Sequence, residues 1–248
     1  MANIDNSEIH DSKVIIAIKS LYLFICFFLG VCGNSIVIIA IIKNKKLQTI
    51  TNCFVLNLAI TDLLFAVCEI PTIIFTTISK KWLLGRFVCD GVGFLNSLFC
   101  TTSIWTLVMI SINRYFNVAK ATQVKVFIQR KEQSTILKIF LVNRNTTNPE
   151  ILNARENNKK RAIKKYFKEV RVTKMLMILV LCFFFCWTPV FVGSMLYSFN
   201  LDLKGFQVAT FGIMCACLNC VLNPLIYSIM NRSFQKCVIQ MWKTIALR

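Results

Sequence analysis

The sequence predicts an all-α membrane protein, a transmembrane helix bundle with five spans and an amphipathic interfacial helix. Three observations lead to this fold class. Of the 248 residues, 56% are hydrophobic and 16% are charged, whereas soluble domains contain about 25% charged residues. Five apolar segments are long enough to cross a bilayer, which takes about 20 residues. Lysines and arginines collect in the connections on one side of the predicted bundle.

The spans are assigned by length and hydropathy. Each carries at most one or two ionisable groups, and the predicted spans are residues 18–42, 53–79, 89–118, 172–199 and 206–230. The first three form one unit, residues 18–118, and the last two form another, residues 172–230. Between these units, residues 119–171 are rich in Lys, Arg, Asn and Glu and contain no apolar run that could span. We expect this segment to be a basic loop with some amphipathic helix.

Orientation follows from the distribution of basic residues. Lysine and arginine are abundant in the first loop, in residues 119–171 and in the tail, and sparse in the other connections. The positive-inside rule therefore predicts a multi-pass protein with its N-terminus outside and its C-terminus in the cytoplasm. Residues 1–17 are then an extracellular N-terminus. The plasma membrane is the expected location.

The tail, residues 231–248, is predicted to contain a surface helix. From Ser233 to Trp242, apolar side chains alternate with Lys236 and Gln240, a pattern typical of a helix that lies on the membrane. Cys237 is a candidate for palmitoylation, and an unmodified interfacial thiol fits the sequence equally well.

Several function classes do not fit the composition. The net charge of +18 comes from residues between apolar segments and not from one face of a soluble fold, so we expect no nucleic-acid partner. Most of the twelve cysteines lie in apolar runs and the chain has one histidine, so no zinc site is expected. No set of nucleophile, base and oxyanion donors is evident, so the chain is not expected to be an enzyme.

Polar side chains inside the spans are costly and require an explanation. Two explanations are open: they form a functional polar core, or they hydrogen-bond neighbouring helices and contribute only to packing. An acid such as Asp62 in mid-membrane favours the first. The residues concerned are Asn34, Asn57, Asp62, Ser103, Asn219 and Asn223.

Helical spacing connects residues at different depths. Ser103 and Arg114 are eleven residues apart, about three turns, and Glu169 and Trp187 are eighteen apart, about five turns. Arg114 and Glu169 are therefore expected to meet at the cytoplasmic base of the bundle. The alternative is that Glu169 is a solvated charge among basic neighbours.

Two prolines predict deformable points in the last two spans. Pro189 removes a backbone hydrogen bond inside an apolar helix and bends it, just after Phe183 and Trp187. Pro224 does the same shortly before Tyr227. A bundle with two bends and a polar interior is more typical of a conformational switch than of an anchor.

At this point the ordered motifs resemble a known family, the rhodopsin-like (class A) G-protein-coupled receptors. Each motif alone is weak, but the set in this order is specific: Gly33-Asn34, Asn57-Leu58-Ala59-Ile60-Thr61-Asp62, Trp82-Leu83-Leu84-Gly85 followed by Cys89, Asn113-Arg114-Tyr115, Phe183 to Pro189, Asn223-Pro224-Leu225-Ile226-Tyr227 and Phe234. The resemblance implies a seven-helix receptor fold, of which five spans are present, and a heterotrimeric G protein as partner.

The resemblance also implies roles for individual residues. G-protein coupling falls to Asn113, Arg114, Tyr115 and Glu169. The activation switch comprises Phe183, Trp187, Pro189, Asn223, Pro224 and Tyr227. An allosteric sodium pocket comprises Asn34, Asp62, Ser103, Asn219 and Asn223, with sodium at Asp62 as the one metal and no other cofactor. The ligand pocket includes Asn96, Trp187 and Cys217.

Departures from the family pattern narrow these implications. Asn113 replaces the usual acid, as in melatonin-type receptors, and Cys217 replaces the lysine that holds retinal in opsins, so no chromophore is expected. Asn96 stands where amine receptors carry an aspartate, which argues against a simple biogenic amine. Helices four and five of the family are missing, and Cys89 lacks the loop cysteine with which it would form a disulfide.

Two functions remain open from the sequence. The first is a receptor for an extracellular small-molecule or peptide ligand that signals to a heterotrimeric G protein across the lipid bilayer. The second is a truncated, non-signalling isoform that acts by association with full-length receptors, as a receptor oligomer, or that is retained in the endoplasmic reticulum.

Overall fold

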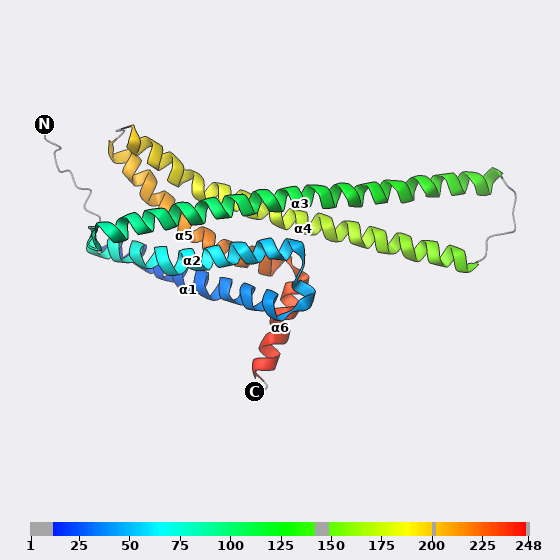
Figure 1. Cartoon of the computed structure of the whole chain (residues 1–248), viewed down its shortest axis with the longest axis horizontal. Coiled ribbons are helices and arrows are strands. Elements are labelled where there is room, and N and C mark those ends of the chain that lie inside the picture. Colours follow the sequence, from blue (N-terminus) through cyan, green and yellow to red (C-terminus); the bar gives the residue numbers. More distant parts are fainter. Residues whose placement is uncertain (1–11, 142–148, 200–201, 247–248) are drawn as a thin grey trace.

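The computed structural model describes residues 12–141, 149–199 and 202–246, and this part of the chain is helical throughout apart from short connections (Figure 1). Residues 1–11, which belong to the predicted extracellular segment, lie outside it. In chain order the elements are α1 (Lys13–Lys43), the short 3-10 helix η1 (Lys45–Leu47), α2 (Ile50–Ser79), α3 (Gly85–Leu141), α4 (Pro149–Ser198), α5 (Asp202–Met230) and α6 (Arg232–Ala246).

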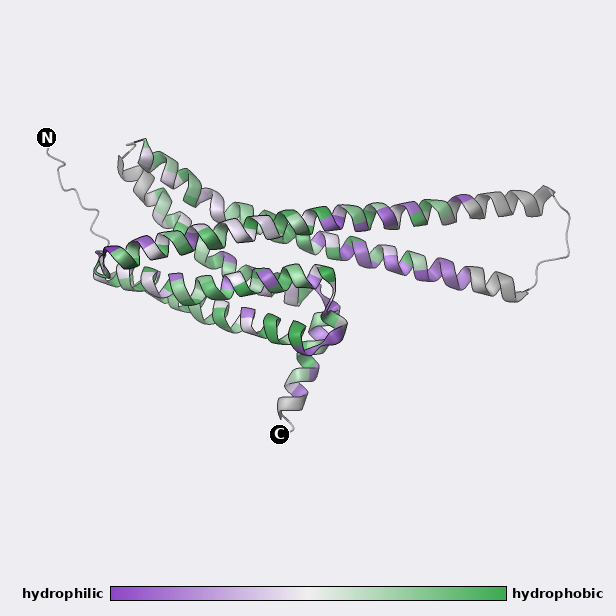
Figure 2. Ribbon diagram, in the orientation of Figure 1, coloured by the Kyte–Doolittle hydropathy of each residue, from purple (hydrophilic) through white to green (hydrophobic). Residues whose placement is uncertain are grey.

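Five of these helices are long and apolar enough to cross a membrane, which confirms the predicted number of spans. The helical stretches that contain these apolar segments are Lys13–Lys43, Ile50–Ser79, Gly85–Val124, Glu156–Leu196 and Val208–Met230. Figure 2 shows that hydrophobic residues predominate along the helices of the bundle. In the part of the chain that the structure describes there is no strand, so the all-α prediction is also confirmed.

The helices pack as one bundle. α1 lies against α2, α4 against α5, and α5 also contacts α1 and α2, while α3 lies between α2 and α4. Apolar side chains from all five helices form a single core, to which Leu23, Ala66, Ile70, Ile110 and Cys217 contribute nearly inaccessible side chains. Of the polar residues that the sequence places in the spans, Asn34, Asp62, Ser103, Asn219 and Asn223 are buried in the same interior, whereas Asn57 is exposed.

α3 and α4 extend together beyond the other helices, and we call residues 119–141 and 149–171 the stalk (Figure 1). The prediction of a loop with some amphipathic helix underestimated the helix here. The segment 94–148 contains neither proline nor glycine, and its Lys, Arg, Gln and Glu residues favour helix. Pro149 begins α4, a position where a proline costs no backbone hydrogen bond.

Glycines allow α4 and α5 to approach until their backbones touch. A Cβ atom on Gly212 would lie 2.5 Å from the backbone nitrogen of Val190, and one on Gly193 would collide with Ala209. Both contacts lie beside Pro189 or on its far side from the stalk. The outer halves of α4 and α5 are therefore held together at a spacing that only glycine permits.

α6 turns away from the bundle at its stalk end (Figure 1). Asn231 starts the helix by accepting hydrogen bonds from the backbone N–H groups of Ser233 and Phe234. The Phe234 ring packs edge-on against Tyr227 with a centroid separation of 4.8 Å. Cys237 is only 5% exposed, and its sulfur lies 3.8 Å from the Ala40 carbonyl oxygen of α1. In this conformation the thiol faces the bundle, which favours the unmodified thiol over the palmitoylated one, the two alternatives that the sequence leaves open.

Candidate functional site

The base of the bundle, where the stalk begins, holds an ion pair between α3 and α4. Arg114 Nη1 donates to Glu169 Oε2 at 2.9 Å, and the side chains are 8% and 22% exposed. The expected meeting of these residues is confirmed, and the alternative of a solvated Glu169 is not. The Glu169 carbonyl also accepts from Thr173, one turn further along α4. The pair therefore joins the two stalk helices at a shielded point.

The residues on either side of Arg114 face elsewhere. Tyr115 is 71% exposed and packs edge-on against the ring of Phe116. Asn113 is half-buried and accepts a hydrogen bond from Asn117 at 3.0 Å, which leaves its own buried amide nitrogen without a partner. Of the three residues in this motif, only Arg114 links α3 to another helix by a polar contact in the described structure.

A second polar site lies in the middle of the bundle. Asn223 Nδ2 of α5 donates to Asp62 Oδ2 of α2 at 2.7 Å, and the two residues are 6% and 4% exposed. Asn34 of α1 donates to two backbone carbonyls, those of Gly30 and Cys220, each at 2.9 Å. These bonds tie α5 to both α1 and α2.

The same interior offers oxygen atoms suited to a small hard cation. Ser103 and Asn219 are 4% and 3% exposed, and Asn219 Oδ1 is buried without a hydrogen-bond partner. Carboxylate, amide and hydroxyl oxygens are the ligands that hard cations prefer. The unpartnered Asn219 oxygen and the Asp62 carboxylate have the ligand chemistry that sodium prefers, so the predicted sodium site stays a prediction. Asn57, by contrast, donates to Thr106 Oγ1 at 2.7 Å and so links α2 to α3.

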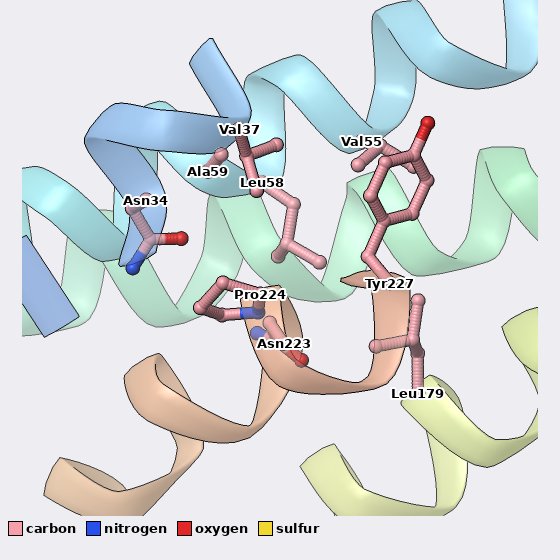
Figure 3. Close-up of a pocket in the computed structure, with 9 residues that line it drawn as sticks. All are labelled: Asn34, Val37, Val55, Leu58, Ala59, Leu179, Asn223, Pro224 and Tyr227. Atoms are coloured by element: carbon pink, nitrogen blue, oxygen red, sulfur yellow. The ribbon is translucent and has the colours of Figure 1, made fainter. Parts of the chain in front are cut away.

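Next to this polar site lies a small pocket between α1, α2, α4 and α5 (Figure 3). It has room for about one water molecule. Asn34, Asn223, Pro224 and Tyr227 are on its wall, and the remaining lining side chains are Val37, Val55, Leu58, Ala59 and Leu179. Pro224, which interrupts the hydrogen bonding of α5, therefore borders a small unfilled space.

An aromatic cluster surrounds Trp187 on α4. Phe183 stacks on the indole with a centroid separation of 5.7 Å, Phe65 of α2 meets it edge-on at 6.3 Å, and Phe191 lies at 6.3 Å. Trp187 is 7% exposed, and its Nε1 atom has no hydrogen-bond partner. Pro189 follows two residues later in the same helix. The predicted aromatic face thus points into the bundle.

The other residues predicted for the outer half are placed as follows. Cys217 is fully buried on α5 and Asn96 is half-buried on α3. Cys89 is exposed and free, near the start of α3, and all other cysteines are free as well. The described residues therefore offer no disulfide for Cys89.

One buried acid was missed by the sequence reasoning. Glu69 on α2 is 2% exposed, and its Oε1 atom has no hydrogen-bond partner. Since an ionisable residue in a span is a functional hypothesis by default, its position alone was a signal. It was overlooked because it belongs to no motif.

Comparison with known proteins identifies the family. The model of the "7 transmembrane receptor (rhodopsin family)" matches residues 33–143 and 139–227. The chain is 36% identical over 116 residues to melanopsin-B from Xenopus laevis, an alignment that covers 47% of this chain and 22% of that protein. It is 36% identical over 109 residues to the histamine H2 receptor of Canis lupus familiaris, covering 44% and 30%.

A third relative is the QRFP-like peptide receptor of Branchiostoma floridae, 31% identical over 118 residues, with 48% of this chain and 31% of that protein covered. The chain thus spans less than a third of the length of each of these relatives. The crystal structure of squid rhodopsin shares the fold, with a TM-score of 0.69 and 22% identity over 95% of this chain and 87% of that one.

The matched proteins are receptors, which confirms the prediction that this chain is not an enzyme. The family match covers most of the chain and agrees with the resemblance found from its motifs. The chain belongs to the rhodopsin family of seven-transmembrane receptors, of which it has five membrane-spanning helices in the part that the structure describes.

Proposed function

We propose that this protein is a receptor of the plasma membrane that transmits the binding of an extracellular ligand to a heterotrimeric G protein. The observation that carries the proposal is the ion pair between Arg114 and Glu169, which joins α3 and α4 where the stalk leaves the bundle. An ion pair that is shielded from solvent can hold α3 and α4 together in a resting conformation. When the pair breaks, the two helices can separate.

In this proposal the pair is the restraint and Arg114 is the coupling residue. When α3 and α4 separate, the guanidinium loses its carboxylate partner and becomes available to a cytoplasmic protein. Its fixed planar donors suit carbonyl and carboxylate groups on such a partner. Arg114 Nε already lacks a hydrogen-bond partner while buried, so the resting arrangement leaves part of its bonding capacity unused.

The aromatic cluster and the Asp62–Asn223 bond provide the route from the ligand side. Trp187 packs on Phe183 and Phe65 one turn or less from Pro189, so displacement of the indole bears on the bend of α4. Asn223 directly precedes Pro224 and bonds to Asp62, so sodium bound at Asp62 would favour the resting arrangement of α5. In this proposal α4 near Pro189 and α5 near Pro224 each adopt two conformations, one in the resting and one in the active receptor.

Orientation is part of the proposal. The stalk and α6 lie at the same end of the bundle (Figure 1), and hydrophilic residues concentrate in the stalk (Figure 2), where the sequence is rich in Lys and Arg. By the positive-inside rule, this distribution supports a cytoplasmic location for the stalk end and an extracellular N-terminus.

The test is G-protein activation in cells that express the full chain. Wild-type protein at normal surface level is expected to raise activation above that of mock-transfected cells, and Arg114→Ala to remove the increase. Arg86→Ala is the matched control, because Arg86 is 95% exposed and pairs with Asp90 at the far end of the bundle. Wild-type protein that reaches the surface without any activation would contradict the proposal, as would equal activation by the Arg114 variant.

A further inference from the structure

Glu69 lies in the half of the bundle that is farthest from the stalk. It is seven residues from Asp62 on α2, about 10 Å along the helix and within about 20° of the same direction. Asp62 points to α5 in the bundle interior, so Glu69 points to the interior as well. Cys217 is six residues from Asn223 on α5, about 9 Å in the same sense, and its thiol is close enough to Glu69 to interact electrostatically.

The described protein supplies no partner for the Glu69 carboxylate. Oε1 is fully shielded and accepts no hydrogen bond. The nearest hydroxyl along α2 is used elsewhere, because Thr72 donates to the backbone carbonyl of Glu69 itself at 2.8 Å. No lysine or arginine of the described segments forms an ion pair with it. An acid left in this state inside a membrane protein is costly, and a counter-charge removes the cost.

An aromatic residue precedes Glu69 by one turn on the same face of α2. This residue is Phe65, and its ring meets Trp187, which in turn packs on Phe183 and Phe191. Aromatic faces attract organic cations, and a carboxylate supplies the neutralising charge. Inorganic cations favour several oxygen ligands, whereas the side chains that lie near Glu69 include the Phe65 ring and the Cys217 thiol. The surroundings therefore suit an organic cation better than a metal ion.

We infer that Glu69 is the anchor for a positively charged group, an ammonium or a guanidinium, on the extracellular ligand of this receptor. This inference rests on the proposed function. Asn96 leaves α3 neutral at the place where amine receptors carry an aspartate, and Glu69 supplies the carboxylate from α2 instead. The uncharged Asn96 therefore does not exclude a cationic ligand. In this inference the positive charge is bound by Glu69 on α2 and not by a residue on α3.

The test uses the purified full chain in lipid nanodiscs and three probes of similar size: phenethylamine, phenethylguanidine and the neutral 2-phenylethanol. A ligand that binds the folded state raises the unfolding temperature with its concentration. For wild-type protein we expect a cationic probe to raise it and the alcohol to leave it unchanged. If phenethylamine raises the unfolding temperature more than phenethylguanidine does, the site prefers an ammonium group. The reverse order indicates a site for a guanidinium group.

Glu69→Gln keeps the shape of the side chain and is expected to abolish the shift produced by the cations. Glu156→Gln is the matched control, since it removes the same charge from an exposed position in the stalk and should leave the shift intact. If Glu69→Gln protein does not fold, Glu69→Asp replaces it and should retain a smaller shift that is still specific for the cations.

Two results would overturn the inference: equal stabilisation of wild-type and Glu69→Gln protein by the cations, or wild-type protein that a cation stabilises no more than the alcohol does. The second result would mean that Glu69 stays protonated and only fills space. Neither result bears on G-protein activation through Arg114, which is measured without any added probe.

Discussion

Asn223 and Asp62 are 161 residues apart in the chain, yet the amide nitrogen of the one lies 2.7 Å from the carboxylate of the other. This single bond joins α2 to α5 at the residue that precedes Pro224. The buried acid Asp62 is thereby coupled to Pro224, because a change in the charge or ligand of Asp62 acts directly on Asn223, the residue before the proline.

Asp62→Asn is expected to remove a dependence of stability on sodium. The amide can still bond to Asn223 but offers no negative charge to a cation. Wild-type protein in nanodiscs should unfold at a higher temperature in sodium chloride than in potassium chloride of equal ionic strength, because a bound ion stabilises the folded state. The variant should unfold at the same temperature in both salts. A sodium effect that persists in Asp62→Asn would place the ion elsewhere.

Glu169→Gln is expected to raise ligand-independent G-protein activation several-fold. The change removes the charge that pairs with Arg114, and breaking a partly buried, charged hydrogen bond costs about 1.5–3 kcal/mol. That loss shifts a two-state equilibrium toward the arrangement with Arg114 released. Activation at equal surface expression is the measurement. Unchanged or lower activation in this variant would show that the pair does not restrain the receptor.

Gly212→Ala is expected to destabilise the bundle by about 1–3 kcal/mol, because the new Cβ would lie 2.5 Å from Val190 N. Gly91→Ala is the matched control. Nothing lies within 4 Å of a Cβ at Gly91 on α3, so this change should be neutral or stabilising through helix propensity. Thermal unfolding in detergent distinguishes the two. Equal unfolding temperatures for both variants would contradict a close contact between the α4 and α5 backbones.

The stalk gives a prediction for pH. A hydrogen bond from Lys160, 2.6 Å away, lowers the pKa of the Glu156 carboxyl below its ordinary value. Because the pKa in the folded state is depressed, the pair favours the helix at pH values above the unfolded pKa, and its contribution is lost as the pH falls through the folded pKa. NMR titration should show that the pKa of the Glu156 carboxyl is higher in Lys160→Met protein than in wild-type protein. The control variant Lys168→Met should leave this pKa unchanged. The same titration curve in wild-type and Lys160→Met protein would rule the pair out in solution.

The sequence was sufficient to predict the five spans, since burial in lipid imposes length and apolarity on every crossing helix. The sequence also predicted the contact between Arg114 and Glu169, because the positions of residues along a straight helix follow from their spacing in the sequence. The helix content of the stalk was underestimated because its sequence lacks such a clear signal. A polar helix without an apolar stripe shows no periodicity, and propensity alone is a weak guide.

The features that the sequence left open depend on tertiary packing. Whether Cys237 faces the membrane or the bundle is decided by where α6 meets Ala40 of α1, and no local pattern contains that information. The partners of Asn34 are backbone carbonyls, which any residue offers, so its bond to Cys220 was invisible in the sequence. Glu69 was visible as an acid in a span, but its lack of a partner appears only when the neighbouring donors are placed.

α3 runs from Gly85 to Leu141 as one unbroken helix of 57 residues, about 85 Å long. Such a rod acts as a lever whose fulcrum is the packed bundle. Its last 23 residues span about 35 Å, so a tilt of about 5° at the bundle carries the far end sideways by about 3 Å. Small rearrangements around a bound molecule would thus be magnified mechanically, and a fluorescent label placed far along the rod would register movements too slight to detect at their origin.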